Sequence, residues 1–141
     1  MTTLTLKQAH TIIEHALAEA RAKGYQPMGV VVVDAAGQTR ASAREDGASA
    51  LRLDIAAGKA GAAVGMGVAS RALAQRAKDL PAFFNAVAST ASQPFIAQTG
   101  AVLVVDAAGA VIGAAGASGG TGDEDEAICI AGIAAAGLSH R

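Results

Sequence analysis

The architecture is set by the stretch Val30-Val31-Val32-Val33-Asp34-Ala35-Ala36-Gly37. Four consecutive β-branched residues predict a short strand that is buried on both faces, because such a run has no polar side for water. The Asp-Ala-Ala-Gly that follows is typical of a turn, since Asp accepts local backbone N–H groups and Gly adopts positive φ. Residues 39–44 then alternate in polarity and predict the returning strand of a hairpin.

A second hairpin is predicted near the other end of the chain. The six residues Val-Val-Asp-Ala-Ala-Gly occur at 32–37 and again at 104–109. Strands are therefore expected over 102–106 and 110–117. The flanking helical segments do not repeat, so we interpret the repeat as one physical solution used twice rather than as a duplication.

Helical patterns surround the two hairpins. Apolar residues recur every three or four positions from Leu6 to Ala20, and Thr5 with Gln8 forms a candidate capping box. Further helices are expected over 49–66, 70–78 and 81–92, and a last one after an N-cap at Thr121. This order predicts one domain over residues 1–141 of the α/β (α+β) class, an antiparallel sheet with helices packed against it.

The composition excludes several classes of protein. Hydrophobic residues make up 52% of the chain, charged residues 16%, and the net charge is -1, which argues against disorder and against nucleic-acid binding. There is one cysteine, no apolar run long enough for a membrane helix, and no visible signal peptide. We therefore expect a cytoplasmic protein without nucleic-acid or membrane partners.

Ala and Gly dominate the apolar residues. By type, 37 residues are Ala and 17 are Gly, whereas only four are aromatic. Small side chains leave little bulk between backbones, so helices are expected to approach the sheet closely.

The glycine-rich segment 116–122 is the first candidate site. Free backbone N–H groups at Gly119 and Gly120, with the Ser118 hydroxyl, have the chemistry to hold a ligand. The alternative is that the glycines serve close packing. Acidic residues 123–126 follow directly and would repel a phosphate, and helix capping with solvation explains them better than a cation site.

Three cations are further candidates. Arg52 and Lys59 are seven residues apart in a predicted helix, so they project from the same side. They either hold an acidic ligand or pair with Asp54, Glu45 or the acidic segment 123–126. Arg44 lies beside a Gly turn, either at the rim of a pocket or in a solvated loop.

The histidines and the single cysteine are candidate ligands of a metal or cofactor. His10 is at the border of the first apolar stripe, and His15 points away from it, so His10 is the better candidate for a haem iron, with an ordinary surface histidine as the alternative. Cys129 is expected to be a small core residue. No catalytic triad, paired-carboxylate site or metal site can be read from the spacing.

The order of these motifs resembles the GlcG/HbpS-type family over essentially the whole chain. The resemblance implies a three-layer α/β/α sandwich with an antiparallel, profilin-like sheet, related to the C-terminal domain of PduO-type corrinoid adenosyltransferases. It also implies homo-oligomers and, in some members, haem binding. The motifs that carry it are Thr5-Leu6, Val31-Val32-Val33-Asp34-Ala35-Ala36-Gly37, Arg44-Glu45-Asp46-Gly47-Ala48, Lys59-Ala60, Gly113-Ala114-Ala115-Gly116-Ala117-Ser118-Gly119-Gly120 and Asp125-Glu126.

Two functional hypotheses follow. The first is a small-molecule-binding protein whose ligand is haem or another tetrapyrrole, with His10 as the cofactor residue. The second is an isomerase or lyase acting on a small organic acid, with Arg44 or Lys59 binding the acid and Asp125 or Glu126 transferring a proton. The candidate ligand-binding residues are Arg44, Arg52, Lys59, Phe84, Ser118, Gly119, Gly120 and Glu126.

Overall fold

Both predicted hairpins are present and together form the centre of one antiparallel sheet. The computed structural model describes residues 3–141. The strand order is β2-β1-β4-β3-β5, and every neighbouring pair is antiparallel. The strands are β1 (Gly29–Asp34), β2 (Thr39–Arg44), β3 (Ala101–Val105), β4 (Val111–Ser118) and the short β5 (Ser139–His140), which the sequence did not predict.

The two Asp-led turns close the hairpins as their sequence predicts. Asp34 Oδ1 accepts the backbone N–H groups of Ala36 and Gln38, both at 3.0 Å. Asp106 Oδ1 accepts those of Ala108 and Ala110 in the same way, at 3.0 and 2.9 Å. A glycine with positive φ follows each Asp and completes the turn.

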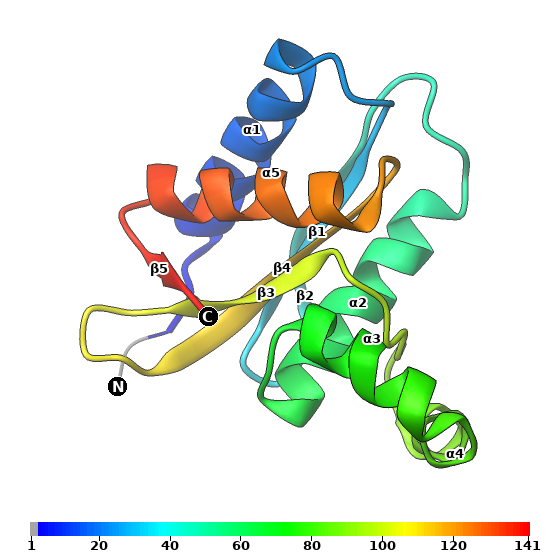
Figure 1. Ribbon diagram of the computed structural model, residues 1–141. Coiled ribbons are helices and arrows are strands. Elements are labelled where there is room, and N and C mark those ends of the chain that lie inside the picture. Colours follow the sequence, from blue (N-terminus) through cyan, green and yellow to red (C-terminus); the bar gives the residue numbers. More distant parts are fainter. Residues whose placement is uncertain (1–2) are drawn as a thin grey trace.

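Helices cover both faces of the sheet, so the predicted three-layer sandwich is confirmed (Figure 1). One face packs against α1 (Leu6–Ala22) and α5 (Gly122–Ala135), and the other packs against α2 (Arg52–Met66). Beside α2 lie α3 (Ser70–Asp79) and α4 (Pro81–Thr90), and α4 projects from the body of the molecule (Figure 1). Helix α2 begins three residues later than predicted, because the Arg52 N–H donates to the Ser49 carbonyl in a turn that precedes it.

Alternate side chains of the valine run face opposite sides of the sheet and so belong to two different core clusters. Val30 and Val32 pack in the cluster under α1 and α5, whereas Val31 and Val33 pack under α2. This confirms that β1 is buried on both faces.

Small residues bring the layers close together. A Cβ atom on Gly132 of α5 would lie 2.2 Å from the Ile12 carbonyl oxygen of α1. Similarly, a Cβ atom on Gly116 of β4 would lie 2.5 Å from the Ala56 carbonyl oxygen of α2. No real Cβ atom tolerates such distances, so the close approach of helices expected from the composition is confirmed.

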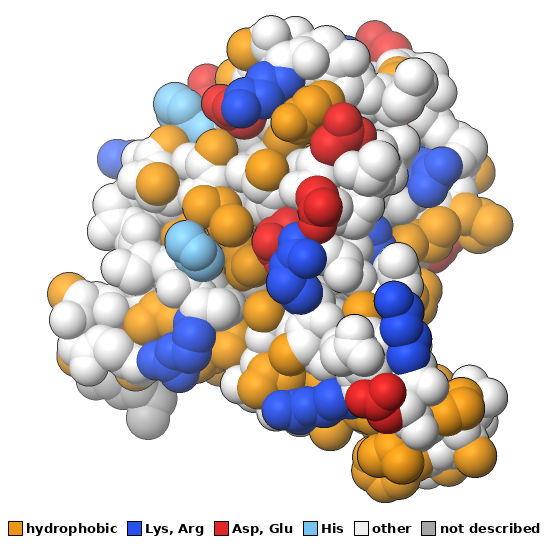
Figure 2. Space-filling model, viewed as in Figure 1, with side chains coloured by type: hydrophobic (Ala, Val, Ile, Leu, Met, Phe, Trp, Pro, Cys, Tyr) orange, Lys and Arg blue, Asp and Glu red, His pale blue; other side chains and the backbone are white. Residues whose placement is uncertain are grey.

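The surface of the described residues is mixed in character. Charged side chains are spread over α1 and α5, and hydrophobic side chains gather over α4 (Figure 2). None of the helices in residues 3–141 combines the length and the apolar character that crossing a bilayer requires.

Candidate functional site

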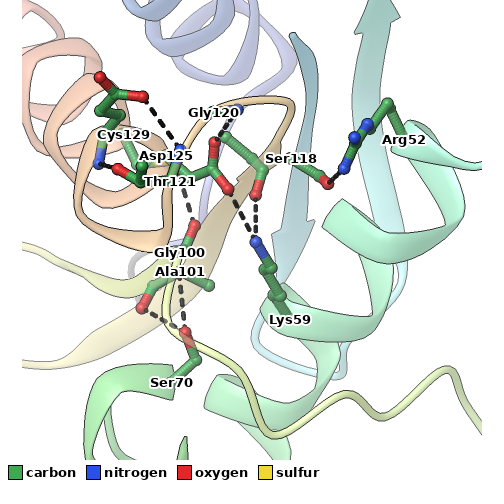
Figure 3. A network of polar contacts seen from close by, with 12 residues as sticks. Arg52, Lys59, Ser70, Gly100, Ala101, Ser118, Gly120, Thr121, Asp125 and Cys129 are labelled. Atoms are coloured by element: carbon green, nitrogen blue, oxygen red, sulfur yellow. Dashed lines mark hydrogen bonds and ion pairs between the residues drawn. The ribbon is translucent and has the colours of Figure 1, made fainter. Parts of the chain in front are cut away.

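A buried ion pair connects helices from opposite faces of the sheet. The Lys59 ammonium of α2 donates to Asp125 Oδ2 of α5 at 2.9 Å and to the Ala117 carbonyl oxygen of β4 at 3.0 Å (Figure 3). The side chains of Lys59 and Asp125 are only 5% and 2% exposed. A charge removed from water this completely requires a partner of opposite charge. Lys59 and Asp125 are such partners for each other.

Gly100 leaves room for the Lys59 side chain next to Asp125. A Cβ atom at this position, directly before β3, would lie 2.7 Å from the Lys59 Nζ. The Gly100 carbonyl oxygen also lies 3.8 Å from Cys129 Sγ. Burial raises the pKa of the Cys129 thiol, and the nearby Asp125 carboxylate raises it further. Cys129 is therefore a protonated core residue, as expected.

The same carboxylate holds the glycine-rich segment. Asp125 Oδ1 accepts the Gly120 backbone N–H at 2.9 Å, so this N–H is occupied within the protein. The Thr121 hydroxyl caps α5 by accepting the Glu124 N–H at 3.2 Å, and the Glu124 side chain accepts the Thr121 N–H at 3.0 Å. The predicted N-cap is thus confirmed as a complete capping box.

Arg52 and Ser118 meet on the α2 side of this network. Arg52 Nη1 donates to Ser118 Oγ at 3.1 Å (Figure 3). Ser118 is 1% exposed, whereas Arg52 is half-buried. The guanidinium has five N–H donors, so one hydrogen bond leaves it with capacity for others.

Glu126 lies outside the buried network. It accepts hydrogen bonds from Arg71 of α3 at 3.1 to 3.3 Å, and Arg71 also pairs with Asp123. The hydrogen bonds to Glu126 and Asp123 raise the pKa of the Arg71 guanidinium. Glu126 therefore acts in a surface ion-pair cluster that joins α3 to α5.

The structure brings together only part of the predicted set. Arg52, Lys59, Ser118 and Gly120 belong to one polar network. The remaining predicted ligand-binding residues make none of the hydrogen bonds of this network. Arg44 donates to the Ala48 carbonyl oxygen at 2.6 Å, Phe84 is buried with Leu73, and Gly119 packs against the Pro27 carbonyl oxygen.

Asp125 is the residue that the sequence interpretation misplaced. The sequence favours capping and solvation for residues 123–126, but Asp125 is buried at the centre of the network. The alternative given for Lys59, a pair with this acidic segment, is confirmed. The position of Asp125 is in phase with the buried stripe of α5, formed by Ile128, Cys129, Gly132 and Ile133. This three- and four-residue spacing was the available signal, because a carboxylate in phase with an apolar stripe points into the core.

His10 lies on a different surface, along one flank of α1. At roughly 100° per residue, Leu6, His10, Leu17 and Arg21 fall within an arc of about 60°. Arg21 Nε contacts Glu45 Oε2 at 2.9 Å, directly after β2, so this flank faces the edge strand β2. Leu6 is 47% exposed and Leu17 is half-buried. Along this flank Leu6 precedes the exposed His10 by about one turn, and Leu17 follows it about two turns later.

His15 occupies the other side of α1. It lies about 140° around the helix axis from His10. On that side the backbone of Ile12 contacts Gly132 of α5. His10 and His15 are thus two exposed histidines of one helix in different surroundings.

Comparisons with known proteins place the chain in a family. A family model described as "Haem degrading protein HbpS-like" matches residues 4–134. The chain belongs to the HbpS-like family. The resemblance stated from the motifs is therefore confirmed. A search of the curated proteins found no match.

Several solved structures share the fold of this chain. A PduOC:haem complex has a TM-score of 0.84 and 25% sequence identity, with 98% of each chain covered. A structure of HbpS has a TM-score of 0.82 and 30% identity, covering 95% of this chain and 90% of that one. A double mutant of HbpS from Streptomyces reticuli has a TM-score of 0.82 and 31% identity, covering 95% and 87%.

The His10 flank fits the chemistry of a haem site at the protein surface. Haem iron takes an imidazole ligand, and the porphyrin requires apolar contacts. His10 would supply the imidazole, and Leu6 and Leu17 would supply aliphatic contacts on the same flank. Beneath it, the half-buried Ala41 and Ala43 of β2 pack against the same core cluster as Leu17.

Proposed function

We propose that this chain is a haem-binding protein in which His10 supplies the ligand to the iron. The observation that carries the proposal is the exposed imidazole on the flank of α1 that faces β2, between Leu6 and Leu17. An exposed leucine beside an exposed histidine is a surface that a porphyrin would cover.

The comparisons support this class of ligand. The matching family is described by haem degradation, and one relative of the same length was solved with haem. Bound haem supplies a redox-active iron, and the protein's own part is to hold and shield it. In this chain His10 would hold the iron, and Leu6 with Leu17 would exclude water from one side of the ring.

A hemin titration with two matched variants tests the proposal. Wild type is expected to give a saturable Soret shift at one haem per chain. His10→Ala is expected to weaken binding at least tenfold, whereas His15→Ala, a change of the same size on the same helix, leaves binding unchanged. Equal affinities of wild type and His10→Ala would exclude His10 as the ligand, and the lack of any saturable shift would end the haem proposal.

Among residues 3–141, no contact specifically supports the second hypothesis, an enzyme acting on a small organic acid. Lys59 and Asp125, which it requires for binding and proton transfer, neutralise each other in the core. Glu126 is held by Arg71. A substrate would have to displace these partners before it could use the same groups.

Two further expectations remain predictions. One is the cytoplasmic location, which cell fractionation measures. The other is the homo-oligomer implied by the family resemblance, whose mass light scattering measures.

A further inference from the structure

A cavity of about 750 Å³, called the turn cavity below, lies at the end of the sheet where both hairpins turn. Strands β1 and β3 are both antiparallel to β4, so they run in the same direction and their turns lie at the same end (Figure 1). The residues that begin the two turns, Asp34 and Asp106, both line the cavity. Leu4, which precedes α1, and Ile112 of β4 line it as well. The turn cavity therefore combines carboxylate groups with aliphatic walls.

Two β-bulges supply lining residues of the turn cavity. In the β1–β2 ladder the register skips Arg40, which lies between the paired residues Thr39 and Ala41. In the β3–β4 ladder the register skips Ile112 in the same way. A bulge turns the side chain of the extra residue out of its regular direction, and bulges are frequent beside functional sites. Both skipped residues line the turn cavity, so the two bulges direct one cation and one aliphatic side chain to the same space.

Asp106 presents a free carboxylate oxygen to this space. The residue is 8% exposed, and within residues 3–141 its carboxylate accepts the two backbone N–H groups of its turn through Oδ1 alone. No side-chain oxygen shut off from solvent in this part of the chain lacks a hydrogen-bond partner, so Oδ2 is accessible, and Asp106 lines the turn cavity. Asp34 likewise uses Oδ1 for its turn. A charge that is nearly buried and only half hydrogen-bonded favours a donor from a bound molecule.

Arg40 is a cation without a partner on the other side of the turn cavity. It is exposed and takes part in none of the ion pairs of the described residues. Strands β1 and β4 lie between β2 and β3, so the backbones of Arg40 and Asp106 are about 14 Å apart. The two opposite charges therefore stand at opposite ends of the cavity and leave space for a molecule between them.

We propose that the turn cavity binds a small zwitterion, an aliphatic ω-amino carboxylate, with its ammonium on Asp106 and its carboxylate on Arg40. An ammonium has three donors for the free Oδ2, and a guanidinium holds a carboxylate through two parallel hydrogen bonds. Leu4 and Ile112 would cover the methylene chain between the two charges.

The charges of the turn cavity disfavour other classes of ligand. A phosphate would be repelled by two carboxylates, and a diamine would place its second cation beside Arg40. Asp34 and Asp106 are separated by β4, about 10 Å between backbones, which is too far for a shared metal ion. Residues 3–141 also contain no cluster of three metal-ligating side chains.

Calorimetric titration with 6-aminohexanoate tests the site. Wild type is expected to bind one molecule per chain. Arg40→Gln and Asp106→Asn are each expected to weaken binding about tenfold, the effect of losing one charge-assisted hydrogen bond. Asn keeps an oxygen for the turn, so the midpoint of urea unfolding is expected to stay near that of wild type. Arg76→Gln and Asp79→Asn are the matched controls on α3, outside the turn cavity, and are expected to bind as wild type does.

Two probes with a single charge assign each end of the ligand. Hexylamine is expected to bind more weakly than 6-aminohexanoate and to lose affinity in Asp106→Asn but not in Arg40→Gln. Hexanoate is expected to show the reverse. A merely structural effect of either substitution would weaken both probes alike, and that result would overturn the assignment of the two ends.

Other outcomes would overturn the site itself. They are the lack of saturable binding of 6-aminohexanoate to wild type, and equal affinities of wild type, Arg40→Gln and Asp106→Asn. Haem binding through His10 is a separate property, so His10→Ala is expected to bind 6-aminohexanoate as wild type does. The failure of either proposal is therefore seen independently of the other.

Discussion

At the scale of single residues, the buried pair Lys59–Asp125 is the main finding. Each side chain satisfies backbone groups as well as its partner, namely the Ala117 carbonyl for Lys59 and the Gly120 N–H for Asp125. A buried pair contributes little net stability compared with two apolar side chains, but removal of one partner leaves a charge without compensation. The pair therefore specifies how α2, β4 and α5 meet more than it stabilises the fold.

A double-mutant cycle checks this interpretation of the pair. Lys59→Met and Asp125→Leu are each expected to lower the free energy of unfolding by about 3–5 kcal/mol, because each leaves one buried charge unpaired. The double variant is expected to lose much less than the sum of the two, as measured by urea unfolding. Lys23→Ala, which breaks an exposed pair with Glu19, is the control and is expected to cost about 0.5 kcal/mol or less. Strictly additive losses would contradict the coupling.

At the scale of elements, the close contact of α1 and α5 depends on one missing side chain. Gly132 lies in the buried stripe of α5 and packs directly on the backbone of α1 at Ile12. A glycine within a helix lowers helix stability, so its presence here is explained by packing rather than by local preference.

Gly132→Ala is expected to destabilise the protein. Helix propensity alone would favour Ala by about 1 kcal/mol, whereas the overpacked contact with Ile12 costs about 1–3 kcal/mol. A net loss in the free energy of urea unfolding would show that the helix contact outweighs the local preference. A gain in stability would mean that α1 and α5 separate easily at this point.

At the scale of the whole molecule, the charges divide the surface into two kinds. Helices α1, α3 and α5 and strand β2 carry exposed charged residues, whereas Phe83 is exposed on α4, a helix without any charged residue, and Leu80 is exposed at the N-cap of α4. The homo-oligomer implied by the family resemblance would link folding to protein concentration.

The midpoint of thermal unfolding is therefore expected to rise with protein concentration. Each tenfold increase stabilises a dimer by about 1.4 kcal/mol, because association is governed by mass action. The wild type is expected to show this rise in scanning calorimetry. A wild-type midpoint that does not depend on concentration would contradict the prediction.

The sequence by itself determined the two hairpins, the order of helices around them and the antiparallel sheet. These features follow from local signals: the valine run, the Asp-led turns and the spacing of apolar residues. The strand β5 was missed, because two residues at an edge carry too little pattern to be recognised.

Only the tertiary structure decided the candidate sites. Lys59 and Asp125 are 66 residues apart in the sequence, and the Lys59 side chain passes close to Gly100. The surroundings of His10 depend on which flank of α1 faces β2, and the exposure of Phe83 depends on which apolar residues remain uncovered after packing. Turn chemistry and periodicity act between neighbours in the chain, whereas burial of a charge or a ring depends on segments that folding brings from far away.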